Sequence, residues 1–301
     1  MNLNELVQSA KDYSQRTIAV AVAEDEEVLS AVLEAVEHGL GKFLLFGDRE
    51  KINQLLREKG PTFVKHDDIK VIHSNSKEKS AELAVKAVHS QDADILMKGN
   101  LHSSTLLKAV LNKDYGLRTG KVLSHIAVFE VQGYDRLIFV TDAGMNISPT
   151  LEQKVEIVAN AVSIARALGV HMPKVAPLAA LETINPSMSA TVDGAILTQM
   201  NKRGQIKDCI VDGPLALDNA VSLSAAKQKG IESEVAGEAD ILLVPSIEVG
   251  NSLYKSLIYF AGAKVGAVVA GAKVPIVLTS RSDSAESKLY SLALAVCCSK
   301  K

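Results

Sequence analysis

The segment with the most evident chemical potential lies near the C-terminus, where an apolar run ends in hydroxyl and guanidinium groups. Val274–Leu278 is apolar with a β-branched bias, and Thr279, Ser280 and Arg281 follow it, before helix-forming residues. A buried parallel strand that ends in such donors before a helix N-terminus gathers anion-binding groups where α/β proteins bind ligands. Asp283 and Glu286 are also an acceptable capping pair for the helix that follows. Both interpretations stay open at this point.

A second polar segment follows the predicted strand Ile95–Met97. It offers a glycine for close backbone approach together with a cation, an amide, an imidazole and hydroxyls at a helix start, which suit phosphate oxygens. Capping by an ordinary Ser or Thr explains the same hydroxyls. The candidate ligand contacts in this segment are Lys98, Asn100, His102, Ser103 and Ser104.

Three more predicted strands end in polar residues, after Val140, Val211 and Val244. If a helix begins near Asn251, this residue can cap it while Lys255 presents a cation one turn further on. Each end also has an ordinary turn or capping explanation. Five polar strand ends in one chain nevertheless favour a shared site, because parallel sheets place their chemistry where strands end. The candidate contacts are Asp142, Asn146, Asp212, Asn251, Tyr254 and Lys255.

The elements that position these residues are those of an α/β fold. Short apolar runs such as Thr17–Val22 alternate with amphipathic stretches such as Glu26–His38, and this repeated βα pattern predicts a parallel sheet. The 301 residues are 47% hydrophobic but only 4% aromatic, with no Trp. A core of Ala, Val, Ile and Leu is typical of parallel sheets covered by helices.

The middle of the chain breaks the alternation. Ile126–Val131 and Leu137–Thr141 are separated only by Gln132–Arg136, and so short a connection predicts antiparallel strands. A long helix from about Thr150 to Leu168 follows, so we interpret the hairpin as entry into a second domain. The predicted domains are residues 1–125 with 278–301, and residues 126–277.

Charge and composition exclude several classes of protein. A net charge of -2 with dispersed Lys and Arg favours neither nucleic acid nor an anionic membrane as a partner. The three cysteines form no disulfide framework, and we expect each to be a small buried hydrophobe. The absence of a signal peptide and of an apolar span of about 20 residues predicts a cytoplasmic protein.

Familiar ligand signatures are also missing from the sequence. It has no G-x-G-x-x-G after a strand and no cysteine pair at zinc spacing. The glycine-rich stretch Gly262–Lys273 imitates a phosphate loop imperfectly, so close packing of helix on sheet explains it better. The carboxylates Asp212, Asp218 and Asp240 form no i, i+4 aspartate pair on a helix, so no metal site is predicted.

In order and spacing, the strand-end motifs resemble the phosphate acetyl/butyryltransferase family over almost the whole chain. The resemblance implies a two-domain, three-layer α/β fold with mostly parallel sheets, shared with isocitrate and isopropylmalate dehydrogenases. It also implies an active-site cleft between the domains and a homodimer or higher homo-oligomer. The segments that carry the resemblance are Lys98–Ser103, Thr141–Asn146, Asp212–Pro214, Gly250–Asn251 with Tyr254–Lys255, and Ser280–Arg281.

The resemblance further implies a reaction, in which a short-chain acyl group passes reversibly between coenzyme A and inorganic phosphate through a ternary complex. Acyl-CoA, phosphate and acyl phosphate are the implied substrates, butyryl is the favoured acyl group, and no metal or further cofactor is required. In this reaction Arg281 would bind the phosphate, and Ser280 would stabilise the oxyanion of the tetrahedral intermediate.

The chain departs from the acetyl branch of the family at one position. There, an aspartate seven residues after the serine is regarded as the base, but the matching residue here is Ser287. Asp283, Glu286 or a water held by them is then the candidate base, with Glu286 preferred. Lys98 and Lys255 remain candidates for contacts with phosphate or with the phosphates of coenzyme A.

Three alternatives to a butyryl-transferring enzyme stay open. The first is an acetyl-transferring member of the same family. The second is a metal-dependent NAD dehydrogenase of similar architecture, and the third is a non-catalytic protein that binds coenzyme A or phosphate. The acyl chain length, the physiological direction and the oligomeric state are not determined by the sequence.

Overall fold

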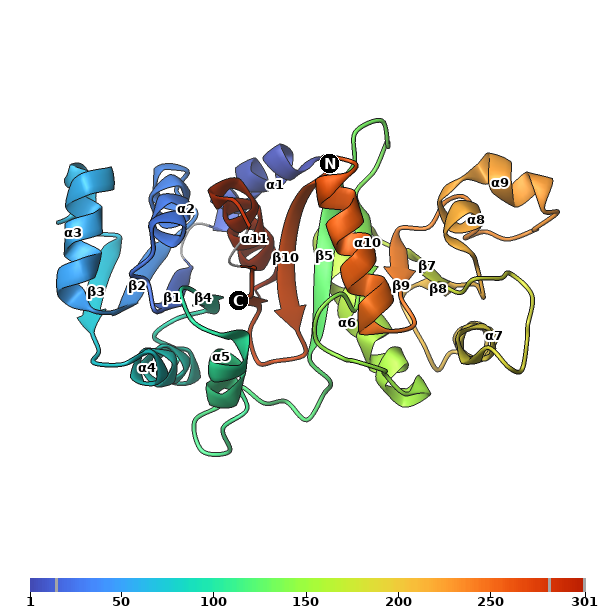
Figure 1. The fold of residues 1–301 in the computed structure, drawn as a ribbon, viewed down its shortest axis with the longest axis horizontal. Helices are drawn as coiled ribbons and strands as arrows, with labels where there is room; N and C mark the ends of the chain where they lie inside the picture. Colours follow the sequence, from blue (N-terminus) through green and yellow to red (C-terminus); the bar gives the residue numbers. More distant parts are fainter. Residues whose placement is uncertain (14–15, 281–282, 300–301) are drawn as a thin grey trace. The chain divides into compact units, whose positions relative to one another are not determined.

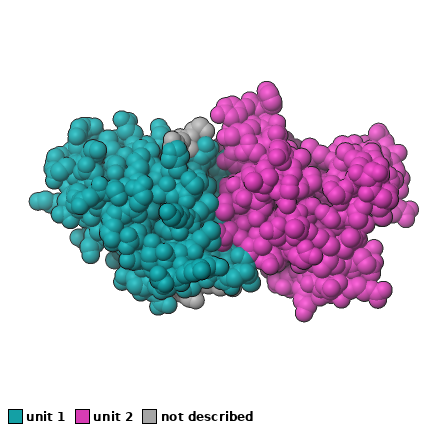
Figure 2. All heavy atoms as spheres, turned by 60° about the horizontal axis from the view of Figure 1, so that its bottom comes forward, with its two compact units in different colours: residues 1–121, 265–301 teal, residues 122–264 magenta. Residues whose placement is uncertain are grey.

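The computed structural model describes residues 1–13, 16–280 and 283–299, and the ribbon in Figure 1 follows the chain through them. The chain forms two compact units, which Figure 2 distinguishes by colour. Unit 1 comprises Met1–Lys121 with Val265–Lys301, and unit 2 comprises Val122–Lys264. No helix among the described residues has the length and apolar character that crossing a bilayer requires.

Unit 1 contains a sheet whose strands run in the order β3-β2-β1-β4-β11-β10. The first five strands are parallel to their neighbours, and β10 is antiparallel to β11. The strands are β1 (Thr17–Ala21), β2 (Lys42–Gly47), β3 (Ile69–His73), β4 (Ile95–Lys98), β10 (Lys264–Ala270) and β11 (Ile276–Val277). The first residue of β10, Lys264, is the last residue of unit 2, and the rest of the strand belongs to unit 1. The helices are α1 (Leu3–Ala10), α2 (Glu26–Glu37), α3 (Arg49–Lys59), α4 (Lys77–His89), α5 (Ser103–Val110) and α11 (Ala285–Cys298).

Helices cover both faces of the unit 1 sheet. Helices α1, α2, α3 and α11 lie on one face, and α4 and α5 lie on the other (Figure 1). Buried Val28, Leu29 and Val32 line the inner side of α2 at helical spacing. A Cβ on Gly266 of β10 would lie 3.0 Å from the Tyr290 carbonyl oxygen in α11. The glycine-rich stretch therefore serves close packing of helix on sheet, as predicted.

Unit 2 contains strands in the order β5-β6-β9-β7-β8. Strands β5 and β6 are antiparallel, which confirms the predicted hairpin, and the other neighbouring pairs are parallel. The strands are β5 (Ser124–Glu130), β6 (Ile138–Thr141), β7 (Lys174–Pro177), β8 (Ile210–Val211) and β9 (Ile241–Leu243). The helices are α6 (Leu151–Ala167), α7 (Ser189–Lys202), α8 (Leu217–Val221), α9 (Leu223–Gln228) and α10 (Ile247–Tyr259). Helices α6 and α7 lie on one face of this sheet and α10 lies on the other (Figure 1).

The α/β architecture with mostly parallel strands confirms the predicted fold class. The units change at 121/122 and 264/265, whereas the sequence placed its domain boundaries at 125/126 and 277/278. That each unit is an independent domain, and that a cleft between domains holds the active site, stay predictions. Below, the carboxyl edge of a sheet means the edge at which its parallel strands end.

Candidate functional site

At the carboxyl edge of unit 1, the segment after β11 lies beside the segment after β4. The two strands are parallel, and Val277 is paired with Met97. Lys98 ends β4, and Thr279 and Ser280 follow β11 at the same edge. The fold therefore brings two of the predicted ligand-binding segments together from sequence positions far apart.

Lys98 stabilises its own loop. Its side chain is 4% exposed, and Nζ donates to the carbonyl oxygens of Gly99 (3.2 Å) and Leu101 (3.4 Å). A Cβ on Gly99 would overlap the Val22 carbonyl oxygen, and the Gly99 N–H donates to Ala21 at 2.8 Å. The glycine thus lets the loop approach the end of β1, which is a structural use of the close approach that the sequence suggested.

The N-terminus of α5 carries the other predicted contacts of this loop. His102 occupies the N-cap position with extended backbone, and its side chain caps no N–H group of the described helix. His102 and Ser104 are exposed, Ser103 and Asn100 are half-buried, and the Asn100 N–H donates to Val22 at 2.8 Å. The imidazole and the hydroxyls therefore face solvent at a helix N-terminus, where anions bind favourably.

Ser280 and Asp283 form a tight turn after β11. The Ser280 N–H donates to Asp283 Oδ2 at 2.7 Å, and the Asp283 N–H donates to the Ser280 carbonyl at 3.2 Å. Asp283 is 8% exposed and Ser280 is exposed, so the buried carboxylate shapes the turn that presents the serine. Arg281 lies outside the described residues. The strand before the turn, β11, is shorter than the predicted Val274–Leu278.

The cap of α11 differs from the predicted one. Ser284 occupies the N-cap position, and its hydroxyl accepts from the Ser287 N–H at 3.2 Å. The predicted pairing of Asp283 with Glu286 is wrong, because the helix begins at Ala285 and Glu286 is then its second residue. Glu286 Oε1 instead accepts from the hydroxyl of Tyr290 at 2.7 Å.

In unit 2, Asp142 organises the loop after β6. Its carboxylate is 2% exposed and accepts five hydrogen bonds, so it is well satisfied inside the protein. The Asn146 side chain reinforces the loop by also donating to the Leu123 carbonyl at 2.8 Å. The donors to Asp142 are the N–H groups of His125 (3.2 Å), Gly144 (2.9 Å), Met145 (2.9 Å) and Asn146 (3.1 Å), and Asn146 Nδ2 (2.5 Å).

Asn251 does not cap a helix, contrary to the prediction. Helix α10 already begins at Ile247, with Ser246 at the N-cap position, so Asn251 is an exposed residue of its second turn. Within the helix, Gly250 allows a close approach to the Asp142 loop that a larger residue would not. A Cβ on Gly250 would lie 2.6 Å from the Asp142 carbonyl oxygen.

Lys255 is held against aromatic rings of α10. Its Nζ lies 5.4 Å from the ring centroid of Tyr254 and 5.9 Å from that of Tyr259, within the range of a cation–π interaction. Tyr254 is 7% exposed and packs edge-on against Phe129, with centroids 5.3 Å apart. The lysine therefore lies between a buried ring, Tyr254, and an exposed one, Tyr259.

Asp212 follows β8 and is half-buried, with its N–H donating to the Val175 carbonyl at 3.2 Å. Because β6, β9 and β8 all run in the same direction, Asp142, Asp212 and the start of α10 lie at one carboxyl edge. The predicted contacts thus fall on two edges, one in each unit. That the two edges form one site stays a prediction.

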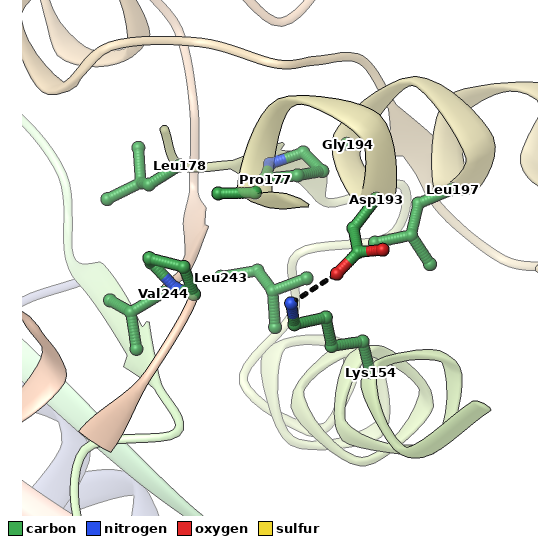
Figure 3. Close-up of a pocket in the computed structure, with 10 residues that line it drawn as sticks. Lys154, Pro177, Leu178, Asp193, Gly194, Leu197, Leu243 and Val244 are labelled. Atoms are coloured by element: carbon green, nitrogen blue, oxygen red, sulfur yellow. Dashed lines mark hydrogen bonds and ion pairs between the residues drawn. The ribbon is translucent and has the colours of Figure 1, made fainter. Parts of the chain in front are cut away.

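A small pocket opens at the carboxyl ends of β7 and β9, between α6 and α7 (Figure 3). Its empty volume is about 190 Å³, including space open to solvent. Inside it, Lys154 Nζ lies 2.6 Å from Asp193 Oδ2, and Lys154 is 5% exposed. This pair could not be predicted from the sequence, because the two residues are 39 positions apart and neither interrupts its helix. The remaining lining residues are Pro177, Leu178, Ala190, Gly194, Leu197, Leu243, Val244 and Pro245.

No group of three or more His, Cys, Asp or Glu residues suited to a metal ion occurs in the described part of the chain. Burial raises the pKa of Asp240, whose Oδ2 accepts from the Lys174 N–H at 2.8 Å. Cys209 is buried as expected, and burial raises the pKa of its thiol to about 11. Cys297 and Cys298 are partly exposed near the end of α11.

An α/β fold whose strand ends gather a serine turn and a polar loop at a helix N-terminus is the setting of an anion-binding enzyme. The chain matches the phosphate acetyl/butaryl transferase family over residues 1–296, and it belongs to this family. The family resemblance drawn from the sequence is confirmed.

Curated relatives match nearly the full chain. A probable phosphate butyryltransferase of Bacillus subtilis (strain 168) is 59% identical over 301 residues, covering 100% of this chain and 99% of the relative. A phosphate butyryltransferase of Clostridium acetobutylicum is 47% identical, with coverages of 98% and 97%. A phosphate acetyltransferase of Thermotoga maritima is 46% identical, with coverages of 98% and 99%.

Solved structures share the fold of this chain. A branched-chain phosphotransacylase from Enterococcus faecalis V583 superposes with a TM-score of 0.83 at 38% identity, covering 94% of this chain and 99% of that one. A 4-hydroxythreonine-4-phosphate dehydrogenase from Burkholderia phymatum gives a TM-score of 0.55 at 13% identity, with coverages of 95% and 99%. The second likeness concerns the fold alone.

Proposed function

We propose that this protein reversibly transfers a short-chain acyl group, preferably butyryl, between coenzyme A and inorganic phosphate. The observation that carries the proposal is full-length similarity to proteins named for this reaction, at 59% and 47% identity. The segments after β4 and β11 supply groups of the kind that the reaction needs.

In the direction that consumes acyl phosphate, a base removes the proton of the coenzyme A thiol and the thiolate attacks the carbonyl carbon. A tetrahedral oxyanion forms, and it collapses as phosphate leaves. We assign the Ser280 hydroxyl to this oxyanion, because Ser280 is exposed at the strand end while its N–H is committed to Asp283. In the opposite direction a phosphate oxygen attacks the thioester and the thiolate leaves.

Phosphate is assigned to Arg281, which lies outside the described residues, because a guanidinium binds two phosphate oxygens at once. The exposed His102 and Ser104 at the start of α5 supply further donors. Lys98 acts through its loop, since its ammonium donates to two loop carbonyls.

Glu286 is our choice of general base, because Asp283 uses one carboxylate oxygen to hold the Ser280 turn. Glu286 is exposed and accepts from the Tyr290 hydroxyl. The pH profile of kcat separates the two carboxylates. Glu286→Gln should abolish the acidic limb of this pH profile. Asp283→Asn should retain the limb but weaken the turn that presents Ser280.

The proposed reaction uses coenzyme A as a substrate and needs neither metal nor nicotinamide. A homodimer or higher homo-oligomer and a cytoplasmic location belong to the same proposal. A net charge of -2 supports the expectation that neither nucleic acid nor membrane is a partner.

Acetyl transfer is the second candidate, and the 46% identity to the Thermotoga maritima phosphate acetyltransferase favours it. One methylene in an apolar pocket changes discrimination by only about 1–3 kcal/mol, so neighbouring chain lengths will also react. Preference is therefore decided by ratios of kcat/KM.

The test follows free thiol from acetyl-, propionyl-, butyryl-, isobutyryl- and valeryl-CoA, with and without phosphate, in the presence of a chelator. We expect phosphate-dependent thiol release with the highest kcat/KM for butyryl-CoA. A maximum at acetyl-CoA would support the second candidate. Saturable binding without turnover would indicate a non-catalytic binder, and metal-dependent reduction of nicotinamide in a parallel assay would indicate a dehydrogenase.

A further inference from the structure

Lys288 places a buried ammonium group against the turn that presents Ser280. It is the fourth residue of α11 and is 3% exposed. Its Nζ donates to the main-chain carbonyl of Asp283, five residues back, because a helical side chain leans towards the N-terminus of its helix. The carboxylate of the same Asp283 accepts from the Ser280 N–H at 2.7 Å. A single residue therefore connects Lys288 to the proposed oxyanion donor.

The charge of Lys288 has no counterion within the described chain. Among the residues that the structure describes, no carboxylate lies within ion-pair distance of its Nζ, and its hydrogen bond goes to the neutral Asp283 carbonyl. The buried Lys154 of unit 2 differs, because its Nζ lies 2.6 Å from Asp193 Oδ2. Lysines are rarely buried without a partner of opposite charge, since an uncompensated charge inside a protein is costly. This points to an anion that binds at the turn.

Folding stability does not explain a lysine at this position. The N-terminal end of a helix carries a partial positive charge, which repels a cation. Leu292 lies one turn further along the same side of α11 and is completely buried, so an apolar side chain at position 288 would continue this packed surface. Replacing a buried charged group by an apolar one of similar volume is often neutral or stabilising. The lysine is better explained by the function of the turn than by packing.

We propose that Lys288 is a positioning residue of the turn that binds phosphate. Its hydrogen bond to the Asp283 carbonyl fixes the main chain of the turn, and its charge stabilises an anion on the exposed side, where Ser280 lies. The inference rests on the function proposed above, with phosphate held by the segment after β11. Lys288 does not touch the phosphate, because protein encloses its side chain. It acts through the turn and through its field, which water screens little at a buried site.

This role affects the two substrates differently. Inorganic phosphate and acyl phosphate carry negative charge at the turn, whereas the thioester group of acyl-CoA is neutral. Loss of the Lys288 charge should therefore weaken the binding of phosphate far more than that of acyl-CoA. A residue that merely supports the fold would affect both substrates alike.

The experiment compares three substitutions at position 288 with the wild-type protein. Lys288→Met keeps the length of the side chain but removes both charge and donor, Lys288→Gln can still donate to the carbonyl without charge, and Lys288→Arg keeps both. Lys288→Met should raise the KM for phosphate about 10- to 100-fold, as expected for loss of a charged hydrogen bond, and leave the KM for butyryl-CoA within about twofold. The rise should be about 3- to 10-fold for Lys288→Gln and less than about threefold for Lys288→Arg.

Calorimetric titration with inorganic phosphate measures the same effect without turnover. Its Kd should rise in Lys288→Met by the same factor as the KM for phosphate. Lys154→Met is the matched control, since it makes the same change at the buried lysine of unit 2 and should leave the Kd and KM for phosphate within about twofold. The midpoint of thermal unfolding of Lys288→Met should stay within about 4 °C of wild type.

An unchanged KM for phosphate in Lys288→Met would overturn the inference. Equal rises of both KM values together with a lower unfolding midpoint would overturn it as well, by assigning Lys288 a role in the fold alone. If Lys288→Met does not fold, equal KM values for phosphate in Lys288→Gln and Lys288→Arg would have the same consequence. If the wild-type protein releases no thiol with phosphate, the proposed function itself has failed, whereas the calorimetric comparison still decides whether Lys288 supports phosphate binding.

Discussion

Two strand-end carboxylates, Asp142 in unit 2 and Glu24 in unit 1, have opposite surroundings. Asp142 accepts five hydrogen bonds from its own loop and from β5, whereas Glu24 Oε2 has no donor in the described chain. A carboxylate thus fixes a loop in one unit, whereas in the other a carboxylate oxygen has no donor from the described residues.

Other polar residues at the two edges differ in the same way, with partners inside the protein in unit 2 and exposed side chains in unit 1. In unit 2, Lys154 is paired with Asp193, and Lys255 lies against two tyrosine rings. In unit 1, His102 and Ser104 are exposed at a helix N-terminus. We therefore expect substitutions at the unit 2 edge to lower stability and substitutions at the unit 1 edge to lower activity.

The largest expected effect is on folding stability. Asp142→Ala leaves one buried and several partly buried donors without an acceptor and should lower the free energy of unfolding by about 3–5 kcal/mol. Urea denaturation followed by circular dichroism measures this change. Asp212→Ala is the matched control, because this half-buried strand-end carboxylate accepts no hydrogen bond from the described residues. An equal loss of stability in both variants would contradict the structural role assigned to the hydrogen bonds of Asp142.

Removal of the proposed oxyanion donor should act on turnover instead. Ser280→Ala should lower kcat about 100- to 1000-fold, or roughly 2.7–4 kcal/mol in transition-state stabilisation. Its free energy of unfolding should change by less than about 0.5 kcal/mol, because the side chain is exposed. Arg281→Ala should lower activity at least as much and also raise the KM for phosphate. Near-normal turnover of Ser280→Ala would remove this hydroxyl from the mechanism.

The fold could be predicted from the sequence because its signals are local. Apolar periodicity placed a helix at Glu26–His38, where α2 spans Glu26–Glu37, and a short connection identified the antiparallel β5–β6 pair. No helix bounds were predicted between β7 and β8, where α7 carries a weakly amphipathic sequence.

The site was predicted less completely, because its details depend on contacts between distant segments. Asn251 resembles a cap in sequence, but α10 already begins at Ile247, and Gly250 lets the helix pass close to Asp142. The position of the Glu24 carboxylate over Gly47 likewise depends on how β1 and β2 are paired. The spacing of residues within one segment cannot predict contacts between segments that are distant in sequence.

The ion pair between Lys154 and Asp193 in unit 2 should have an intermediate effect on stability. Lys154→Met leaves the Asp193 carboxylate without its 2.6 Å partner, and we expect a loss of about 1–3 kcal/mol in unfolding free energy. The loss is limited because the Asp193 side chain is 22% exposed and water compensates part of it. Adding Asp193→Leu should restore most of the stability, since the pocket walls are apolar. If the double variant does not recover its free energy of unfolding, the ion pair also stabilises other contacts in this region.

Cys209 gives the smallest expected effect and tests whether the region before β8 stays closed in solution. Burial raises the pKa of its thiol to about 11, so at pH 8 the native protein holds it as the neutral thiol. Because the thiolate is the nucleophile, iodoacetamide should modify Cys209 far more slowly in the native protein than in urea, as peptide mapping by mass spectrometry will measure. The sign of the shift also means that reactivity rises as the pH approaches 11, while activity at pH 7 is unaffected. Rapid labelling at pH 8 without loss of activity would show that this part of unit 2 opens readily.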